Sequence, residues 1–262
     1  MIFHIEPLEK DDIDTIIDIY WRACQDPEAD HPLPLILPSG LQQDARALLR
    51  EEFEPSDGRW EKRYTVAREV ETREIAAVCG WTMNHKALRK GLDIFDYWED
   101  EVLPVRRELH DEFPVRGINV AMDEAFTKAV VLAELEEVAG EWRYATLDLL
   151  ATDPKWQQQG AASALLMEFL DRVEGAGLNC YVVASTMGRR LYMNFGFEPH
   201  KSIRFDAREW YDGNRRCIHW LMMRQSCAGS RTMKNKRRSP SSLPQRRDKA
   251  NCRLRSRSLR GA

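Results

Sequence analysis

The stretch that decides the fold runs from Leu150 to Leu166 and reads LATDPKWQQQGAASALL. It starts inside an apolar segment, residues 145–152, whose composition predicts a β-strand that ends at Asp153-Pro154. Gly160 then begins a segment in which apolar residues recur at the spacing of one helical face, and two glycines close it. The sequence therefore predicts a strand, a short loop and an amphipathic helix in direct succession.

This succession favours binding of an anion where the helix begins. The small residues at 160–162 let a ligand approach the backbone, and the N–H groups of the first helical turn lack acceptors within the helix. Together with the positive end of the helix dipole, such groups bind phosphate and pyrophosphate. A simpler reading, in which Gly-Ala-Ala only begins a well-packed helix, remains open at this point.

Strands and helices alternate on both sides of this stretch, which predicts one α/β domain over residues 1–225 without internal repeats. The predicted strands are 2–5, 64–70, 75–83, 145–152, 179–184, 203–205 and 218–223, and the predicted helices are 13–24, 41–52, 122–138, 160–173 and 187–194. Residues 84–140 form a helical insertion before the strand at 145–152, as a lid or a substrate wall. We expect prolines to keep the loop at 27–38 free of helix and to break the front half of the insertion at Pro104 and Pro114.

Composition restricts the class of protein. A chain of 262 residues, 43% of them hydrophobic, can bury an ample core, and no run approaches the roughly 20 apolar residues that cross a membrane. The first residues lack a signal-peptide pattern, and the six cysteines form no C-x-x-C pair, so we expect reduced thiols, no metal and a cytoplasmic location. Searches for a P-loop, H-E-x-x-H, G-x-S-x-G and G-x-G-x-x-G find nothing.

The net charge of −3 hides two unlike parts. The last 37 residues, 226–262, carry 12 basic residues and one acid, a charge of +11, whereas the first 225 carry 27 basic and 41 acidic residues, a charge of −14. We expect 226–262 to be a basic disordered tail. Its basic clusters resemble a bipartite nuclear-import signal, which makes a nuclear location an alternative, and the tail is equally compatible with translation past a mistaken gene boundary. Nucleic acid is not an expected partner of the folded part.

Two motifs resemble the GNAT superfamily of acyl-CoA N-acyltransferases. Its signature Q/R-x-x-G-x-G/A is matched by Gln157, Gly160 and Ala162, with Pro154 three residues earlier. Some thirty residues later the family has Y-x-x-x-G-F, and residues 192–197 read YMNFGF. The close resemblance covers about 145–200, and the stretch 150–166 is most similar to fungal secondary-metabolite-type members.

The resemblance implies a mixed, mostly antiparallel sheet flanked by helices, with acetyl-CoA as the acyl donor between two splayed strands. It implies that the backbone of Leu150 and Thr152 binds the pantetheine arm and that the Leu150 N–H stabilises the oxyanion. The implied pyrophosphate cradle consists of Gln157, Gln158, Gln159, Gly160, Ala161, Ala162 and Ser163. Family members often read Q-R-R-G, so this chain lacks two cations there, for which Arg189 or Arg190 is a candidate substitute.

For catalysis, the resemblance implies Tyr192 as the general acid near the CoA sulfur. The family base often lies on the fourth strand, at positions that correspond to Thr146 and Asp148, and only Asp148 ionises near neutral pH. Two structural alternatives stay open: Tyr192 as an aromatic ring packed under the cofactor, and Asp148 as an anchor of a strand end.

The sequence thus predicts an N-acetyltransferase that acts on a small amine, and the acidic body favours a cationic one. The alternatives are a protein lysine or N-terminal acetyltransferase and an acyl-CoA-binding regulator without turnover. For two further features we expect a structural role and not a functional one. His31, in the proline-rich loop, is expected at the surface, and the aromatic cluster Phe95, Tyr97 and Trp98 is expected to be a helix packed on the core with its acids in solvent.

Overall fold

The computed structural model describes residues 2–26, 30–54, 62–84, 93–138, 143–210 and 216–224, and the predicted tail lies outside them. Seven strands form one mixed sheet in the order β1-β2-β3-β4-β5-β7-β6. All neighbouring strands are antiparallel except β4 and β5. The strands are β1 (Phe3–Pro7), β2 (Lys62–Glu69), β3 (Ile75–Asn84), β4 (Tyr144–Thr152), β5 (Asn179–Ser185), β6 (Glu198–Asp206) and β7 (Arg216–Arg224). The predicted fold class, a mostly antiparallel sheet with flanking helices, is confirmed.

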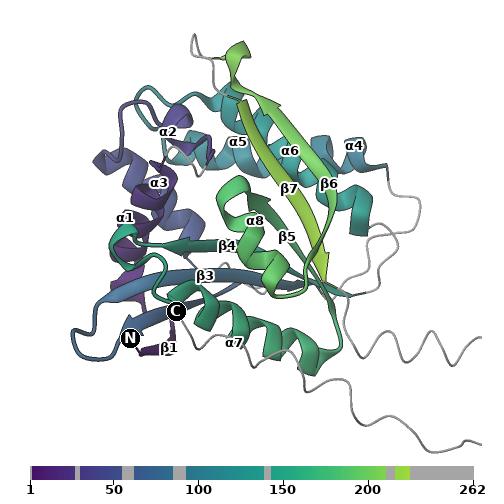
Figure 1. The fold of residues 1–262 in the computed structure, drawn as a ribbon. Helices are drawn as coiled ribbons and strands as arrows, with labels where there is room; N and C mark the ends of the chain where they lie inside the picture. The colour runs from purple at the N-terminus through teal and green to yellow at the C-terminus, as the bar shows by residue number, and fades with distance from the viewer. Residues whose placement is uncertain are drawn as a thin grey trace, which may run out of the picture.

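Helices cover both faces of the sheet (Figure 1). The α1 face carries α1 (Ile13–Cys24), α2 (Leu33–Ile36), α3 (Gln43–Phe53) and α6 (Val120–Val138). The α7 face carries α7 (Ala161–Ala176) and α8 (Thr186–Asn194). Each face buries its own apolar cluster, with Ile16 and Ile17 of α1 at the centre of one and Leu165 and Phe169 of α7 at the centre of the other. The two layers leave β4 and β5 in the middle of the molecule.

The segment between β3 and β4 is more helical than its prolines predict. It contains α4 (Ile94–Tyr97), the π-helix η3 (Trp98–Val102), α5 (Leu103–Glu112) and α6. Pro104 does not break this run, because it stands in the first turn of α5, directly after a wide turn in which the Leu103 N–H bonds the Trp98 carbonyl. Pro114 follows α5 at its end, as expected.

The proline-rich loop also holds one turn of helix, α2, against our expectation. Pro32 and Pro34 lie at its N-terminal end, where a missing N–H leaves no helical hydrogen bond unmade. Of the aromatic cluster, Trp98 is buried as expected and the neighbouring acids Glu99 and Asp100 are exposed, whereas Phe95 is exposed instead of packing on the core.

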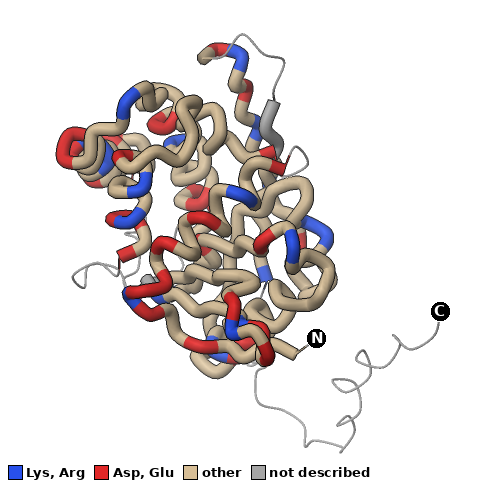
Figure 2. The backbone as a smooth tube through the Cα atoms, turned by 90° about the vertical axis from the view of Figure 1, so that its left-hand side faces the viewer, with Lys and Arg blue, Asp and Glu red and all other residues tan. Residues whose placement is uncertain are grey.

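A buried ionic network fixes the inserted helices to the α1 face. Arg106 of α5 bonds Glu52 of α3 at 2.8 Å and also bonds Asp123 of α6, and the Nε2 atom of His110 lies 2.9 Å from Asp123. Burial raises the pKa of Asp123, but the hydrogen bond from His110 and the charge of Arg106 lower it overall. Elsewhere acidic and basic positions are interspersed along the chain (Figure 2). The inserted helices are therefore an integral part of the wall on this face.

Candidate active site

The candidate site lies where the two central strands separate. β4 and β5 pair only over residues 144–147 and 179–182, although β4 continues to Thr152 and β5 to Ser185. The ends of the two strands therefore diverge and leave a wedge in the sheet, with α8 beside β5 and β7 (Figure 1). Alternate residues of a strand turn their backbone groups to the same edge. Leu150 and Thr152 are such a pair on the widening part of β4.

A β-bulge marks the start of the wedge. Gly80 of β3 lies opposite Leu149 and Trp81 lies opposite Leu147, so Asp148 has no residue opposite it. Gly80 is required at this point, because a Cβ atom there would lie 2.5 Å from the Tyr64 ring and 3.3 Å from the Cβ atom of Leu149. The bulge thus places Asp148 beside the wedge.

Asp148 is exposed and is held by a neighbour on β3. The Thr82 hydroxyl donates a hydrogen bond of 2.5 Å to its carboxylate. Thr146, the other position that the family resemblance implies, is buried and pairs with Thr82 and Tyr181 in the sheet. Of the two positions, only Asp148 has an ionisable side chain within reach of a ligand.

The loop after β4 presents an exposed helix start. Gly160 has φ +93°, and it precedes α7 with no side chain capping that end. The first backbone bond of the helix runs from the Ala164 N–H to the Gly160 carbonyl, so the N–H groups of 161–163 lack helical acceptors. Residues 158–160 are exposed. The predicted cradle therefore offers free backbone donors to an anion.

The cradle contains little positive charge from side chains. Gln159 folds back onto the Lys155 carbonyl at 2.8 Å, and the Lys155 amine pairs with Glu74 at 2.7 Å. Arg189 lies 4.1 Å from the centre of the Trp220 ring, and its Nε atom is buried without a hydrogen-bond partner among the described residues. Arg190 is exposed. Backbone donors and the helix dipole thus provide most of the attraction for an anion here.

Tyr192 lies on the other side of the sheet from Asp148. It is buried in the cluster of the α7 face with Cys79 and Cys180, and its ring meets Phe197 edge-on at 5.6 Å. Burial raises the pKa of the Tyr192 phenol, so the phenol holds its proton at neutral pH. No hydrogen bond to its hydroxyl comes from the described residues. Tyr192 and Asp148 thus lie on opposite faces of the sheet near the wedge.

Two histidines, His31 and His219, meet on the α1 face, and the sequence did not predict this contact. His31 is partly buried rather than at the surface: its Nδ1 accepts the Leu33 N–H at 3.2 Å, and its Nε2 lies 3.4 Å from the Tyr20 hydroxyl. The rings of His31 and His219 are 6.1 Å apart. Burial lowers the pKa of His31 to about 3 and that of His219 to about 4. His219 comes from β7, far along the chain, and no local pattern marks it.

Glu134 of α6 is the second residue that the sequence did not indicate. Burial, and then the charge of Asp148, raise the pKa of its carboxyl to about 8. Its position in an ordinary helical pattern, among other glutamates, gave no sign of this environment. Glu134 is thus a partly buried carboxyl whose pKa the charge of Asp148 also affects.

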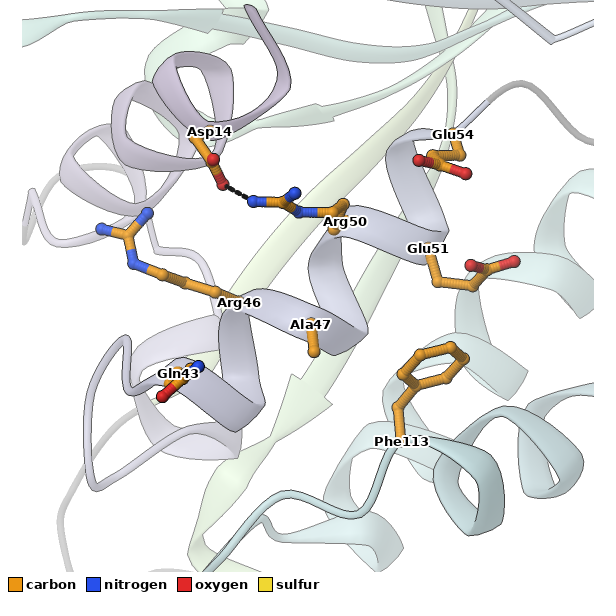
Figure 3. A pocket seen from close by; sticks show the side chains of 8 residues that line it. All are labelled: Asp14, Gln43, Arg46, Ala47, Arg50, Glu51, Glu54 and Phe113. Carbon is orange, nitrogen blue, oxygen red and sulfur yellow. Dashed lines mark hydrogen bonds and ion pairs between the residues drawn. The ribbon is translucent and has the colours of Figure 1, made fainter. Parts of the chain in front are cut away.

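Other features of the surface are separate from the site. The hollow in Figure 3 lies over α3, and its lining includes no residue of β4, β5, α7 or α8. It is lined by Asp14, Gln43, Arg46, Ala47, Arg50, Glu51, Glu54 and Phe113. Within the described ranges, no group of three or more His, Cys, Asp or Glu side chains is placed to hold a metal ion. Among the same residues, no helix has the length and apolar character needed to cross a bilayer.

The fold and the wedge define a class: α/β proteins in which a split central sheet meets the open N-terminus of a helix. Residues 107–208 match the family model described as the acetyltransferase (GNAT) domain. The match includes the bulge, the loop, α7 and α8. A search of the curated proteins finds no significant match to the sequence.

Solved structures with the same fold are distant in sequence. Polyamine N-acetyltransferase of Drosophila melanogaster is 11% identical with a TM-score of 0.56, over 86% of this chain and 100% of that one. A histone acetyltransferase HPA2 and related acetyltransferase from Corynebacterium glutamicum is 18% identical with a TM-score of 0.53, over 87% and 98%. Arylalkylamine N-acetyltransferase 2 from Aedes aegypti is 14% identical with a TM-score of 0.50, over 85% and 98%. At these identities the likeness establishes the GNAT fold.

Proposed function

We propose that this chain is an acetyl-CoA-dependent N-acetyltransferase whose acceptor is a small cationic amine. The observation that carries the proposal is the wedge between β4 and β5, which opens next to the uncapped N-terminus of α7. An extended pantetheine arm fits an unpaired strand edge, and a pyrophosphate fits free helical N–H groups. The match to the GNAT family model over the same segment supports this donor.

In this proposal the backbone of Leu150 and Thr152 binds the pantetheine arm, and the Leu150 N–H stabilises the tetrahedral oxyanion. The pyrophosphate binds residues 157–163. Since Gln158 and Gln159 replace the basic residues frequent in the family, we expect backbone donors to dominate this contact. No metal takes part.

The amine attacks from the α1 face, where Asp148 lies, and the thiolate leaves toward the α7 face, where Tyr192 lies. This arrangement places the base and the acid on opposite sides of the thioester carbon. Burial raises the pKa of the Tyr192 phenol, which therefore is protonated at neutral pH and can give its proton to the CoA thiolate that forms beside it. Asp148, fixed by Thr82, attracts the ammonium form of the acceptor.

The preference for a cationic acceptor follows from the negative net charge of residues 1–225. The body carries −14, and the exposed Asp148 carboxylate adds a negative charge beside the wedge. Clefts lined by one sign of charge concentrate ligands of the opposite sign. A polyamine, an amino sugar or another small amine meets this requirement. Membership of the fungal secondary-metabolite-type subgroup stays a prediction from the loop sequence.

The test is a panel of amines incubated with acetyl-CoA, with release of free thiol as the readout and calorimetry for acetyl-CoA binding. We expect Asp148→Asn and Tyr192→Phe to lower turnover by about 10²-fold or more while acetyl-CoA still binds. Asp171→Asn, an exposed acid on α7, is the matched control and should leave turnover unchanged.

Three other outcomes separate the alternatives. Transfer to histone peptides but to no small amine would assign protein acetylation. Binding of acetyl-CoA without transfer, and without an effect of either variant, would assign an acyl-CoA-binding regulator. Absence of both binding and thiol release would reject the proposal.

A further inference from the structure

A cavity of about 470 Å³ lies at the end of the sheet where β2 begins. Its lining comes from the end of β1, the first turn of α1, the start of β2, Trp81 of β3 and Arg172 of α7. Tyr64 belongs to the apolar cluster of the α1 face and Trp81 to that of the α7 face, so the cavity reaches around the end of β2 and touches both layers. Its volume is in the range of pockets that bind small molecules.

This cavity is separate from the wedge between β4 and β5. The wedge opens toward Thr152, whereas Trp81 lies opposite Leu147, a residue that still pairs with β5. Arg172 stands three turns along α7 from Ala161, about 16 Å from the candidate pyrophosphate cradle. The described residues that line the cavity include none of the cradle and neither of the two candidate catalytic residues.

Two guanidinium groups converge on the Trp81 ring beside this cavity. The Cζ atom of Arg63, from β2, lies 5.7 Å from the ring centre, and that of Arg172, from α7, lies 5.9 Å from it. Trp81 is buried, whereas both arginines are exposed. Guanidinium groups bind carboxylate and phosphate oxygens through pairs of N–H donors. The lining therefore favours an anion next to the indole.

The acids of the lining lie on other elements than the two arginines. Glu9 precedes α1, and Glu54 follows α3 and pairs with Lys10 at 3.6 Å. Arg172 bonds Glu168 through its Nε atom, which uses one of the five N–H donors of the guanidinium. Donors for an anion thus remain on the side of Trp81.

The rest of the lining supplies an apolar wall and one unused donor. Pro7, Leu8 and Ile13 form the apolar part. The indole N–H of Trp81 is buried and has no acceptor among the residues that the structure describes. A buried donor without an acceptor is costly, and an oxygen atom of a ligand would satisfy it. Cations, an unused donor and an apolar wall together are complementary to an anion that carries an apolar body.

We propose that this cavity is a second ligand site, which binds a small organic anion. The carboxylate or phosphate group of the ligand lies beside Arg63 and Arg172, and its apolar or aromatic body lies against Leu8 and Ile13. This ligand is neither the donor nor the acceptor of the proposed acetyl transfer, and its binding does not depend on that reaction.

The position of the cavity links it to the bulge of β3. Trp81 follows Gly80 in the strand, and the Tyr64 ring packs against Gly80 so closely that a Cβ atom there would lie 2.5 Å from it. Both aromatic residues line the cavity. A bound anion therefore contacts the two side chains that flank the bulge beside Asp148, and it acts as an effector of this part of the sheet.

The first test is calorimetry on the full chain with phenylacetate and phenyl phosphate as probes. At least one of them should bind, about tenfold or more tightly than 2-phenylethanol, which lacks the charge, and than acetate or inorganic phosphate, which lack the body. The anion that binds better identifies the head group. Failure of both anions to bind, or equal binding of 2-phenylethanol, would reject the site.

Variants of the arginines test where the anion binds. Arg63→Gln and Arg172→Gln should each weaken binding about tenfold. Arg107→Gln is the matched control, because Arg107 is an exposed arginine of α5 that pairs with Glu124 and does not line the cavity. Affinities of both variants within twofold of wild type would overturn the assignment.

The last test separates this site from the cradle of α7. Binding of the anion should persist within threefold in protein saturated with CoA, and displacement by CoA would reject the second site. The anion should also shift two proton–nitrogen NMR signals, those of the Gly80 backbone and of the Trp81 indole, the latter assigned by its loss in Trp81→Phe. If the anion binds and neither signal moves, it lies elsewhere and the proposal is wrong.

Discussion

Arg22 of α1 and Asp153, which follows β4, form an ion pair of 2.6 Å across 131 positions of the chain. The Asp153 carboxylate is buried and also accepts the Lys155 N–H at 3.1 Å, which fixes the first turn of the loop. The same loop continues into the candidate pyrophosphate cradle. The first helix of the chain therefore holds the anion-binding loop in place from the opposite face of the sheet.

Arg22→Ala should destabilise the fold by about 1–3 kcal/mol, because it leaves the buried Asp153 carboxylate without its charged partner. Acetyl-CoA affinity should decrease as well, since the loop loses its anchor. Urea unfolding and calorimetry measure the two effects. Arg50→Ala is the control: Arg50 and its partner Asp14 are both about half exposed, so the loss should stay below about 1 kcal/mol. Equal effects of the two variants would contradict the anchoring role.

Gly160→Ala should weaken acetyl-CoA binding and cost about 1–2 kcal/mol of stability. A Cβ atom meets nothing within 4 Å at this position, so the cost comes from the backbone, which has φ +93°. Gly175→Ala, also free of neighbours but inside α7, should raise stability by about 0.5–1 kcal/mol. The paired thermal unfolding curves should therefore shift in opposite directions, and a shared direction would refute the interpretation.

Stability should fall between about pH 6.5 and pH 4 because His31 and His219 are buried in their neutral forms. Burial lowers their pKa values to about 3 and about 4, so in this window the unfolded chain binds more protons than the native one. Each histidine should contribute up to about 1.4 kcal/mol per pH unit. Urea unfolding at several pH values measures the slope.

His219→Leu should make that slope shallower, whereas His4→Gln, at an exposed position of β1, should not change it. If the slope of the His219→Leu variant equals that of wild type, the histidine is not buried as a neutral group in solution.

Gly80→Ala should disturb the bulge and therefore the placement of Asp148. The new methyl group would lie 2.5 Å from the Tyr64 ring, a clash that costs about 1–3 kcal/mol in a packed core. We expect a lower melting temperature together with a decrease in kcat, and little change in acetyl-CoA affinity, because the cradle is built on the far end of β4. A variant that is less stable but fully active would show that the bulge does not position Asp148.

Local patterns predict the strands and most helices well because each element repeats its apolar residues at its own period. Proline misled the prediction at Pro34 and Pro104, since a missing N–H has no consequence in a first helical turn or after a π-turn. The loop at 157–163 could be recognised because its chemistry resides in consecutive backbone groups.

The acceptor side could not be predicted in the same way. Asp148 could be predicted only from the family resemblance, and its hydrogen bond to Thr82 is visible only in the structure. Glu134 and His219 lie on α6 and β7, and their desolvation arises only when these elements pack on the sheet. Nothing in the sequence around Glu134 distinguishes it from Glu136 and Glu137, which are paired at the surface. Desolvation, which shifts its proton affinity, is a property of the assembled structure alone.

Among the residues that the structure describes, four residue pairs of β4 and β5 join strands β1–β4 to strands β5–β7. The sheet is thus two half-sheets connected by a short seam: α1 and α7 pack against the half that contains β3 and β4, and α6 and α8 pack against the half that contains β5, β6 and β7. At the wedge the end of β4 pairs only with β3 and the end of β5 only with β7, so a ligand there supplies backbone partners to the two edges that face each other across the opening. Bound acetyl-CoA would then hold the two half-sheets together, so the cooperativity of unfolding would depend on the acetyl-CoA concentration.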